Sequence, residues 1–168
     1  MKINKNGKYT IRTSICIYRI IIQSESTAKQ IPSAALLRKW TKATLLDNQY
    51  QSAMLTIRVV DEAEMGALNL AYRHKPGPTN VLSFPFEPHE ANSTKIPILG
   101  DIVICAPIVA SEADLQHKSL KAHWAHMIVH GVLHLLGYDH ISDKEAAVME
   151  ALEIKTLDLL EFPNPYKR

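Results

Sequence analysis

The sequence predicts an α+β domain, and three observations carry this prediction. Short segments are rich in β-branched residues, longer segments repeat apolar residues at helical spacing, and the two kinds of segment do not alternate strictly along the chain. With 168 residues, of which 46% are hydrophobic, the chain is long enough to bury a core. We expect one domain over residues 13–168, preceded by a polar, basic and flexible tail of residues 1–12.

Strands and helices follow from local patterns. Four segments rich in β-branched or apolar residues are predicted strands: 15–22, 54–60, 81–86 and 100–106. Five segments are predicted helices: 33–46, 62–74, 107–117, 120–136 and 143–160. Asp61 and Ser142 are expected to cap two of these helices, because their short polar side chains can accept hydrogen bonds from free backbone amides. The proline-rich residues 75–78 form a break, and residues 87–97 form a long loop.

A metal site is predicted around the end of the helix at 120–136. His130 and His134 are four residues apart, so their rings lie on one helical face about 6 Å apart. Gly137 suits a left-handed turn at the helix end, which can bring His140 back toward His134. Three imidazoles leave a tetrahedral Zn²⁺ with one open position, as in catalytic zinc sites. We therefore expect one Zn²⁺ per chain, bound by these three histidines.

Two residues near the proposed ligands are not themselves assigned as ligands, His126 and Asp139. His126 continues the histidine row, but it lies about 12 Å along the helix axis from His134, so these two cannot share one ion. Asp139 precedes the third ligand. Two interpretations of it stay open: it orients an imidazole, or it is an ordinary acidic residue of the turn.

Cysteine content and charge distribution indicate the cellular compartment and the kind of partner. Cys16 and Cys105 are too few for a disulfide framework, which favours a reducing compartment, and we expect a cytoplasmic protein. No segment has the roughly 20 apolar residues of a membrane span. Residues 1–50 carry nine Lys and Arg against two acidic residues, whereas the remainder carries ten against fifteen. This asymmetry is typical either of a side that binds a polyanion or of a solvated basic face with a loose tail.

Two further residues are candidates for the site. Arg73 stands at the end of a predicted helix beside the proline-rich turn, where its guanidinium can hold a phosphate through two hydrogen bonds. Taken alone, a surface charge is the plainer interpretation of this residue. Asp101 stands at the entry of an otherwise apolar strand, where a turn aspartate is the plainer interpretation.

These stretches together resemble the YbeY family of bacterial endoribonucleases, which are ribosomal RNA maturation factors. The resemblance covers about residues 15–160. Its signature is residues 130–140 (HGVLHLLGYDH), preceded in the family's order by Tyr72-Arg73, residues 78–84 (PTNVLSF) and residues 99–102 (LGDI).

The resemblance implies a zincin-like α+β fold with a mixed sheet of about four strands, and helices packed against that sheet. It implies zinc held by the three histidines, Arg73 as a catalytic or substrate-binding residue, and Asp101 as a family acid with a less settled role. It further implies cleavage of single-stranded RNA, maturation of small-subunit ribosomal RNA 3′ ends, ribosome quality control, and contact with the ribosome or ribosomal proteins. Asn80 stands where other members have Asp, so no catalytic carboxylate is assigned there.

Two alternatives remain beside the nuclease. The offsets of His130, His134, Gly137 and His140 match those of metzincin proteases, but Gly131 stands where such proteases need a glutamate to activate water. The other alternative is a ribosome-assembly factor that uses zinc only structurally. For the nuclease, the nucleophile is either zinc-bound hydroxide or the RNA 2′-hydroxyl, and the sequence does not choose between them.

Overall fold

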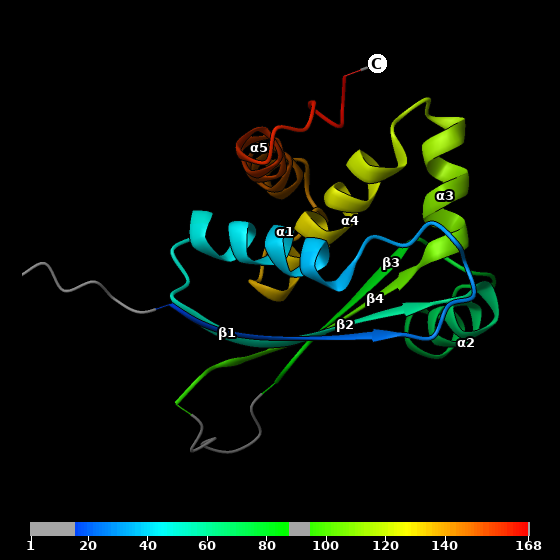
Figure 1. Ribbon diagram of the computed structural model, residues 1–168, viewed down its shortest axis with the longest axis horizontal. Coiled ribbons are helices and arrows are strands. Elements are labelled where there is room, and N and C mark those ends of the chain that lie inside the picture. Colours follow the sequence, from blue (N-terminus) through cyan, green and yellow to red (C-terminus); the bar gives the residue numbers. More distant parts are fainter. Residues whose placement is uncertain (1–15, 88–94, 168) are drawn as a thin grey trace, which may run out of the picture.

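The computed structural model describes residues 16–87 and 95–167, and Figure 1 shows how their helices and strands are arranged. The strands are β1 (Ile17–Ser24), β2 (Ser52–Val60), β3 (Val81–Pro85) and β4 (Ile98–Cys105). The helices are α1 (Ala34–Asp47), α2 (Glu62–Arg73), α3 (Ala106–Leu115), α4 (Leu120–Leu135) and α5 (Asp143–Leu159). The α+β class is confirmed. The predicted flexible tail, residues 1–12, lies outside the described residues.

The four strands form one mixed sheet in the order β1-β2-β4-β3. β1, β2 and β4 run parallel, and β3 is antiparallel to β4, which confirms the predicted mixed sheet of about four strands. β4 begins at Ile98, two residues before the predicted start. The reason is pairing: Met54 lies opposite Ile98, and the backbone N–H of Phe86 donates to the carbonyl of Leu99 at 2.9 Å.

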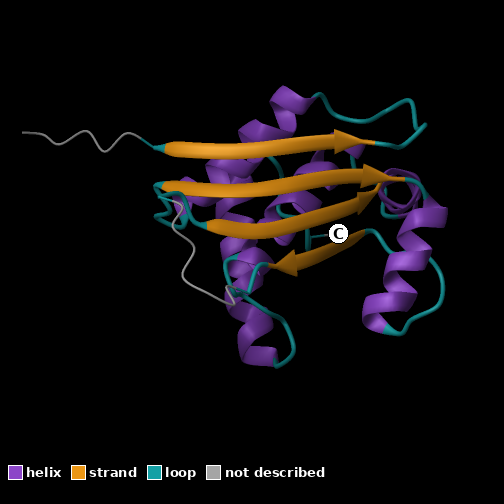
Figure 2. Ribbon diagram, turned by 90° about the horizontal axis from the view of Figure 1, so that it is seen from below, coloured by secondary structure: helices purple, strands orange, loops and turns teal. Residues whose placement is uncertain are grey.

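The helices cover the two faces of the sheet unequally (Figures 1 and 2). α1 and α4 lie against one face, and α3 and α5 pack against α4 on the same side. α2 packs at one end of the other face, where Met65 joins a small apolar cluster with Val60, Leu82, Val103 and Cys105. No helix among the described residues is long and apolar enough to cross a membrane.

α4 is the central helix of the thicker layer. Its Trp124, Ile128 and Leu133 are at most 1% exposed, as the helical spacing of apolar residues predicts. The helix lies so close to the sheet that a Cβ atom added to Gly131 would be 2.9 Å from Cγ2 of Ile102 in β4. Residue 131 therefore faces the sheet, and His130 and His134 line one pocket together with residues of β3.

We predict that Gly100→Ala destabilises the fold far more than Gly77→Ala. Gly100 has φ +133°, and a Cβ there would lie 2.1 Å from the carbonyl oxygen of Phe84, so both backbone strain and a clash with backbone oppose it. Gly77 also has positive φ, +85°, but a Cβ there meets nothing within 4 Å. We expect a loss in the free energy of unfolding of about 3 kcal/mol or more for the first variant and about 1 kcal/mol for the second. Urea titrations measure both, and equal losses would contradict the register described for β4.

Candidate metal centre and adjoining pocket

His130 and His134 form the first part of the candidate metal centre. They are one turn apart in the last part of α4, with ring centroids 4.6 Å apart and their Nε2 atoms 3.1 Å apart. Two ligand atoms that bind one tetrahedral Zn²⁺ at about 2.0 Å lie roughly 3.3 Å from each other. The two imidazoles are therefore already spaced as a pair of zinc ligands.

A helix-ending turn brings in His140. Gly137, with φ +91°, donates its N–H to the carbonyl of His134 at 3.0 Å, and Tyr138 donates to the carbonyl of Leu133 at 3.1 Å. This pair of hydrogen bonds is the Schellman motif, which needs a left-handed residue at the position of Gly137. The chain reverses, and the ring of His140 comes within 5.5 Å of His130 and 5.1 Å of His134, measured between centroids. The sequence prediction of this turn agrees with the structure.

The three histidines suit a zinc ion. One ring nitrogen from each lies within 4.8 Å of the other two, so small ring rotations bring all three to ligand spacing. Burial lowers the pKa of His134, and the neighbouring His130 and His140 lower it further. A lowered pKa keeps the imidazole neutral, which is the form that binds a metal. His140 is exposed, leaving that side of the cluster open to solvent.

Glu153 of α5 is a residue that sequence reasoning missed. Its carboxylate is fully buried and accepts a hydrogen bond from Nδ1 of His130 at 2.7 Å. It also accepts from Nε2 of His126 at 3.3 Å and from the hydroxyl of Tyr166. Burial alone would raise the pKa of Glu153, but the hydrogen bonds from His126 and His130 outweigh it and lower the pKa below its usual range. Glu153 is therefore a buried anion beside a proposed ligand.

Asp139 has a different contact from the one that a ligand-orienting residue requires. Its Oδ1 accepts a hydrogen bond from the backbone N–H of His140 at 2.8 Å. This is the contact of an ordinary turn residue, one of the two interpretations that the sequence leaves open. The carboxylate beside the imidazole of His130 comes instead from α5.

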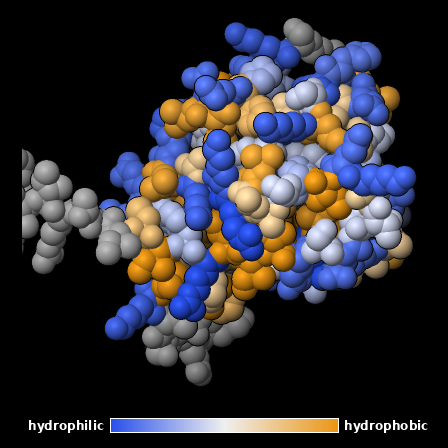
Figure 3. All heavy atoms as spheres, viewed as in Figure 1, coloured by the Kyte–Doolittle hydropathy of each residue, from blue (hydrophilic) through white to orange (hydrophobic). Residues whose placement is uncertain are grey.

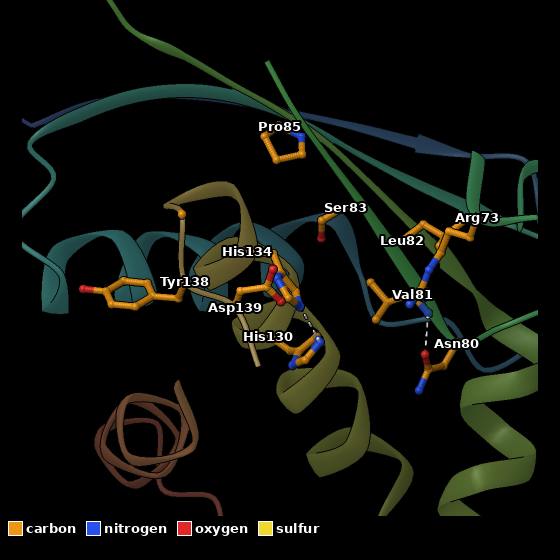
Figure 4. Close-up of a pocket in the computed structure, with 11 residues that line it drawn as sticks. Arg73, Asn80, Val81, Leu82, Ser83, Pro85, His130, His134, Tyr138 and Asp139 are labelled. Atoms are coloured by element: carbon orange, nitrogen blue, oxygen red, sulfur yellow. Dashed lines mark hydrogen bonds between the residues drawn. The ribbon is translucent and has the colours of Figure 1, made fainter. Parts of the chain in front are cut away.

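Arg73 shares a pocket with the histidines. The pocket has a volume of about 440 Å³, and Figure 4 shows the side chains around it. Its lining comes from the end of α2, from β3 with the residue before it, and from the end of α4 with the turn after it: Arg73, Asn80, Val81, Leu82, Ser83, Pro85, His130, His134, Gly137, Tyr138 and Asp139. In the view of Figure 4, Arg73 and the two histidines lie on opposite sides of Val81 and Ser83.

The turn between α2 and β3 holds Arg73 at this pocket. Arg73 is the last residue of α2, and His74, with φ 56°, ends the helix in the left-handed conformation. The buried Asn69 donates its side-chain amide to the carbonyl of Gly77 at 2.8 Å, which ties the helix to the turn after it. The guanidinium stays exposed, so it is available to a ligand.

Asn80 is held firmly at the edge of the pocket. Its Nδ2 donates to both carboxylate oxygens of Glu112, at 3.2 and 3.1 Å, and its Oδ1 accepts from the backbone N–H of Val81 at 2.7 Å. Nε2 of His123 donates to Oε2 of Glu112 at 2.7 Å. Asn80 therefore lines the pocket as a fixed polar group.

Asp101 lies outside the residues that line this pocket. It is exposed in β4, and its neighbour Ile102 is fully buried beneath Gly131 of α4. Because successive side chains of a strand point to opposite faces, Asp101 points to the sheet face away from α4. The structure therefore brings Arg73 and the histidines together and does not bring Asp101 to them. A catalytic role for Asp101 stays a prediction that this geometry does not support.

Comparisons with known proteins agree on one family. The family model described as endoribonuclease YbeY matches residues 20–161. A protein named endoribonuclease YbeY, from Nitrosococcus oceani, is 51% identical over 146 residues, which make up 87% of this chain and 95% of that protein. The solution structure of a Thermotoga maritima protein is 22% identical, covers 90% of this chain and 100% of its own, and superposes with a TM-score of 0.55. At that identity the likeness shows the fold alone.

We predict one equivalent of zinc, bound by His130, His134 and His140. His140→Ala should weaken zinc binding greatly, because it removes one of three ligands. His126→Ala should leave the stoichiometry at one, because His126 lies about 12 Å along the helix axis from His134. Metal analysis of the purified variants measures both effects. Loss of zinc from the His126 variant, with retention in the His140 variant, would overturn the assignment.

Proposed function

Because the chain belongs to the endoribonuclease YbeY family, it is a nuclease of the hydrolase class, and we propose that it cleaves single-stranded RNA with a zinc ion held by His130, His134 and His140. The observation that carries this proposal is the shared pocket. His130 and His134 line one part of it and Arg73 another. The proposed metal ligands and a guanidinium that can bind phosphate therefore line the same pocket. Its volume of about 440 Å³ is within the range of pockets that hold small ligands, and we expect one nucleotide to fit.

The three histidines and Arg73 have different roles in the proposed reaction. The three imidazoles bind the ion, which when bound supplies Lewis acidity and a water of lowered pKa. Arg73 binds the scissile phosphate and stabilises the charge that develops on its oxygens. Either hydroxide or the RNA 2′-hydroxyl is the nucleophile, and the two routes leave different product ends. A substrate with a single 2′-deoxynucleotide at the cleavage site distinguishes them, because only the second route needs that hydroxyl.

The proposed cellular role is maturation of the 3′ end of small-subunit ribosomal RNA, together with ribosome quality control. RNA is the substrate, and the ribosome or its proteins are the proposed partners. Support comes from the family, whose relative from Nitrosococcus oceani is named an endoribonuclease. We propose a cytoplasmic location, since ribosomal RNA is processed there in bacteria and the chain has only two cysteines.

A cleavage assay tests the proposal directly. Structured and single-stranded RNA are incubated with the protein as purified, after removal of metal by a chelator, and after addition of Zn²⁺. We expect cleavage of the single-stranded RNA, its loss with the chelator, and its recovery with zinc. If removal of the metal leaves cleavage unchanged, zinc is not part of the catalytic site. If no RNA is cleaved in any condition while RNA binding persists, the assembly factor with structural zinc is the better account.

We predict that Arg73→Ala slows RNA cleavage by roughly 10²- to 10³-fold, the scale of losing one preorganised donor to a transition state. Arg73→Lys should recover little, because an ammonium cannot reproduce the two parallel hydrogen bonds of a guanidinium. Zinc content should not change, since no ligand is removed. Single-turnover rates at matched zinc occupancy measure the effect.

Lys75→Ala is the matched control for this prediction. It removes one exposed positive charge two residues away, from a side chain that does not line the pocket. If Arg73 contributes only to the general attraction of RNA, the two alanine variants should lose activity equally. Equal rates would remove Arg73 from the catalytic site.

Gly131 argues against the alternative function, a metalloprotease. A protease would need a glutamate at this position, but residue 131 faces Ile102 of the sheet and has no side chain that could act as a base. We therefore predict no zinc-dependent hydrolysis of an unfolded protein substrate, measured as release of new amino termini. Robust hydrolysis by a preparation free of other proteases, abolished by His140→Ala, would sink this claim.

A further inference from the structure

Glu153 joins three side chains from different parts of the chain. It stands on α5, is fully buried, and faces the histidine row of α4. One oxygen, Oε1, accepts from Nδ1 of His130 at 2.7 Å. The other, Oε2, accepts from Nε2 of His126 at 3.3 Å and from the hydroxyl of Tyr166. All three contacts use the carboxylate as an acceptor, so it is satisfied as an anion.

The contact with His130 decides which of its two nitrogens carries the proton. A neutral imidazole has one N–H, and the carboxylate of Glu153 holds that N–H at Nδ1. The lone pair is then on Nε2, and this Nε2 is the atom 3.1 Å from Nε2 of His134. The hydrogen bond thus selects the tautomer, and fixes the ring orientation, that a zinc ligand at this position needs.

Tyr166 reaches Glu153 from the last residues of the chain. The preceding Pro165 is buried, and its carbonyl accepts a hydrogen bond from Nζ of Lys118 at 2.6 Å. The backbone N–H of Tyr166 donates to Oδ1 of Asn164 at 2.8 Å, and the Tyr166 ring lies edge-on to His126 at 5.7 Å. These contacts hold the segment after α5 against α4, on the side of the histidine row. The phenol hydroxyl can therefore restrain the carboxylate at Oε2, the oxygen that His130 does not contact.

We propose that Glu153 is a positioning residue for the metal ligand His130, and that Tyr166 holds the carboxylate of Glu153 in place, so that the segment 162–166 is part of the metal centre. The inference rests on the proposed zinc site of His130, His134 and His140. It adds two residues that contact neither the proposed ion nor the RNA. It also gives the end of the chain a function, although it is 26 residues beyond the third proposed ligand, His140.

A second metal site is the main competing explanation. His126, His130 and Glu153 place three possible ligand atoms within 4.8 Å of one another. However, the atoms of His130 and Glu153 are 2.7 Å apart, which is a hydrogen-bond distance and shorter than the roughly 3.3 Å between two ligands of one tetrahedral zinc. The Tyr166 hydroxyl also occupies Oε2. The geometry thus favours a hydrogen-bonded anion over a second site.

Two conservative variants test the proposal. Glu153→Gln keeps the volume, but its amide can either accept from Nδ1 of His130 or donate to it, so it no longer selects one tautomer. Tyr166→Phe removes only the hydroxyl of a side chain that is 44% exposed, and it should fold normally. Tyr18→Phe is the matched control. It also removes one phenol hydrogen bond, from Tyr18 to the carbonyl of Tyr50 at 2.6 Å, but Tyr18 stands on β1, which carries none of the proposed ligands.

Two measurements separate positioning from a merely structural role. The first is the zinc dissociation constant of the folded protein, obtained by competition with a chromogenic chelator. We expect it to rise roughly 10- to 100-fold in Glu153→Gln, as for other residues that orient ligands, and about two- to tenfold in Tyr166→Phe. Tyr18→Phe should not change it. The second is the His130 tautomer in the metal-free protein, read from its ¹⁵N chemical shifts. It should be Nδ1–H in the wild type and a mixture in Glu153→Gln.

Each outcome decides the proposal. Zinc affinities within twofold of wild type in both variants overturn it, as does an unchanged His130 tautomer in Glu153→Gln. Two zinc equivalents in the wild type and one in Glu153→Gln would make Glu153 a ligand, and would also overturn it. If the wild type binds no zinc, the proposed metal chemistry fails. The tautomer of the metal-free protein still tests whether Glu153 orients His130, so the two failures are distinguishable.

Discussion

The structure depends on the close approach of α4 to the sheet at Gly131. A side chain at this position would collide with the buried Ile102 of β4. The absence of a Cβ therefore lets α4 pack closely against this strand. The hydroxyl of Ser83 in β3 also donates to the carbonyl of Gly131, at 3.2 Å. This contact fixes how far His130 and His134 stand from β3. Arg73 ends α2, and a short turn joins α2 to β3, so the position of β3 also sets the pocket that Arg73 shares with the two histidines.

The packing of α5 on α4 places the buried carboxylate of Glu153 beside the histidines of α4, where it is hydrogen-bonded. Burying a carboxylate away from water costs several kcal/mol unless its oxygens are hydrogen-bonded. Glu153 is fully buried, yet His126, His130 and Tyr166 all donate to it. A similar arrangement lies nearer the start of α4, where Glu112 accepts hydrogen bonds from His123 and Asn80. Three of the four histidines of α4, namely His123, His126 and His130, thus have an acidic partner, which accounts for their place on a helix that is otherwise largely apolar.

Sequence reasoning succeeded where the determining interactions are local. The spacing of His130 and His134, with Gly137 after them, specifies a helix end and a turn within eleven residues, and the fold class follows from patterns of similar length. It did less well where pairing between distant segments decides. β1 extends to Ser24 instead of ending at 22, because Ser24 lies opposite Val59 in the parallel ladder, and no local pattern predicts that.

Glu153 is a second residue that local patterns do not predict, because its two histidine partners are 23 and 27 residues away in the chain. One signal could have found it: Glu153 stands four residues after Met149 and four before Leu157, which are both buried. An acid within the apolar stripe of a helix requires a buried partner. Arg73, by contrast, is a candidate by its position, but only the family resemblance favours a role in the site, since a lone arginine at a helix end does not distinguish a phosphate site from a surface charge.

The connection between α4 and α5 has a consequence for how a metal would act on the fold. The three proposed ligands span the end of α4 and the turn after it, so an ion bound by them would tie His140 to the helix. Ser142 then begins α5 with a capping box to Glu145, and three turns later Glu153 returns to His130. A closed path therefore runs from the metal ligand through the turn and α5 back to the same imidazole. Since binding energy at such a site is also folding energy, loading the site should stabilise the turn and α5 together with α4, and not the turn alone.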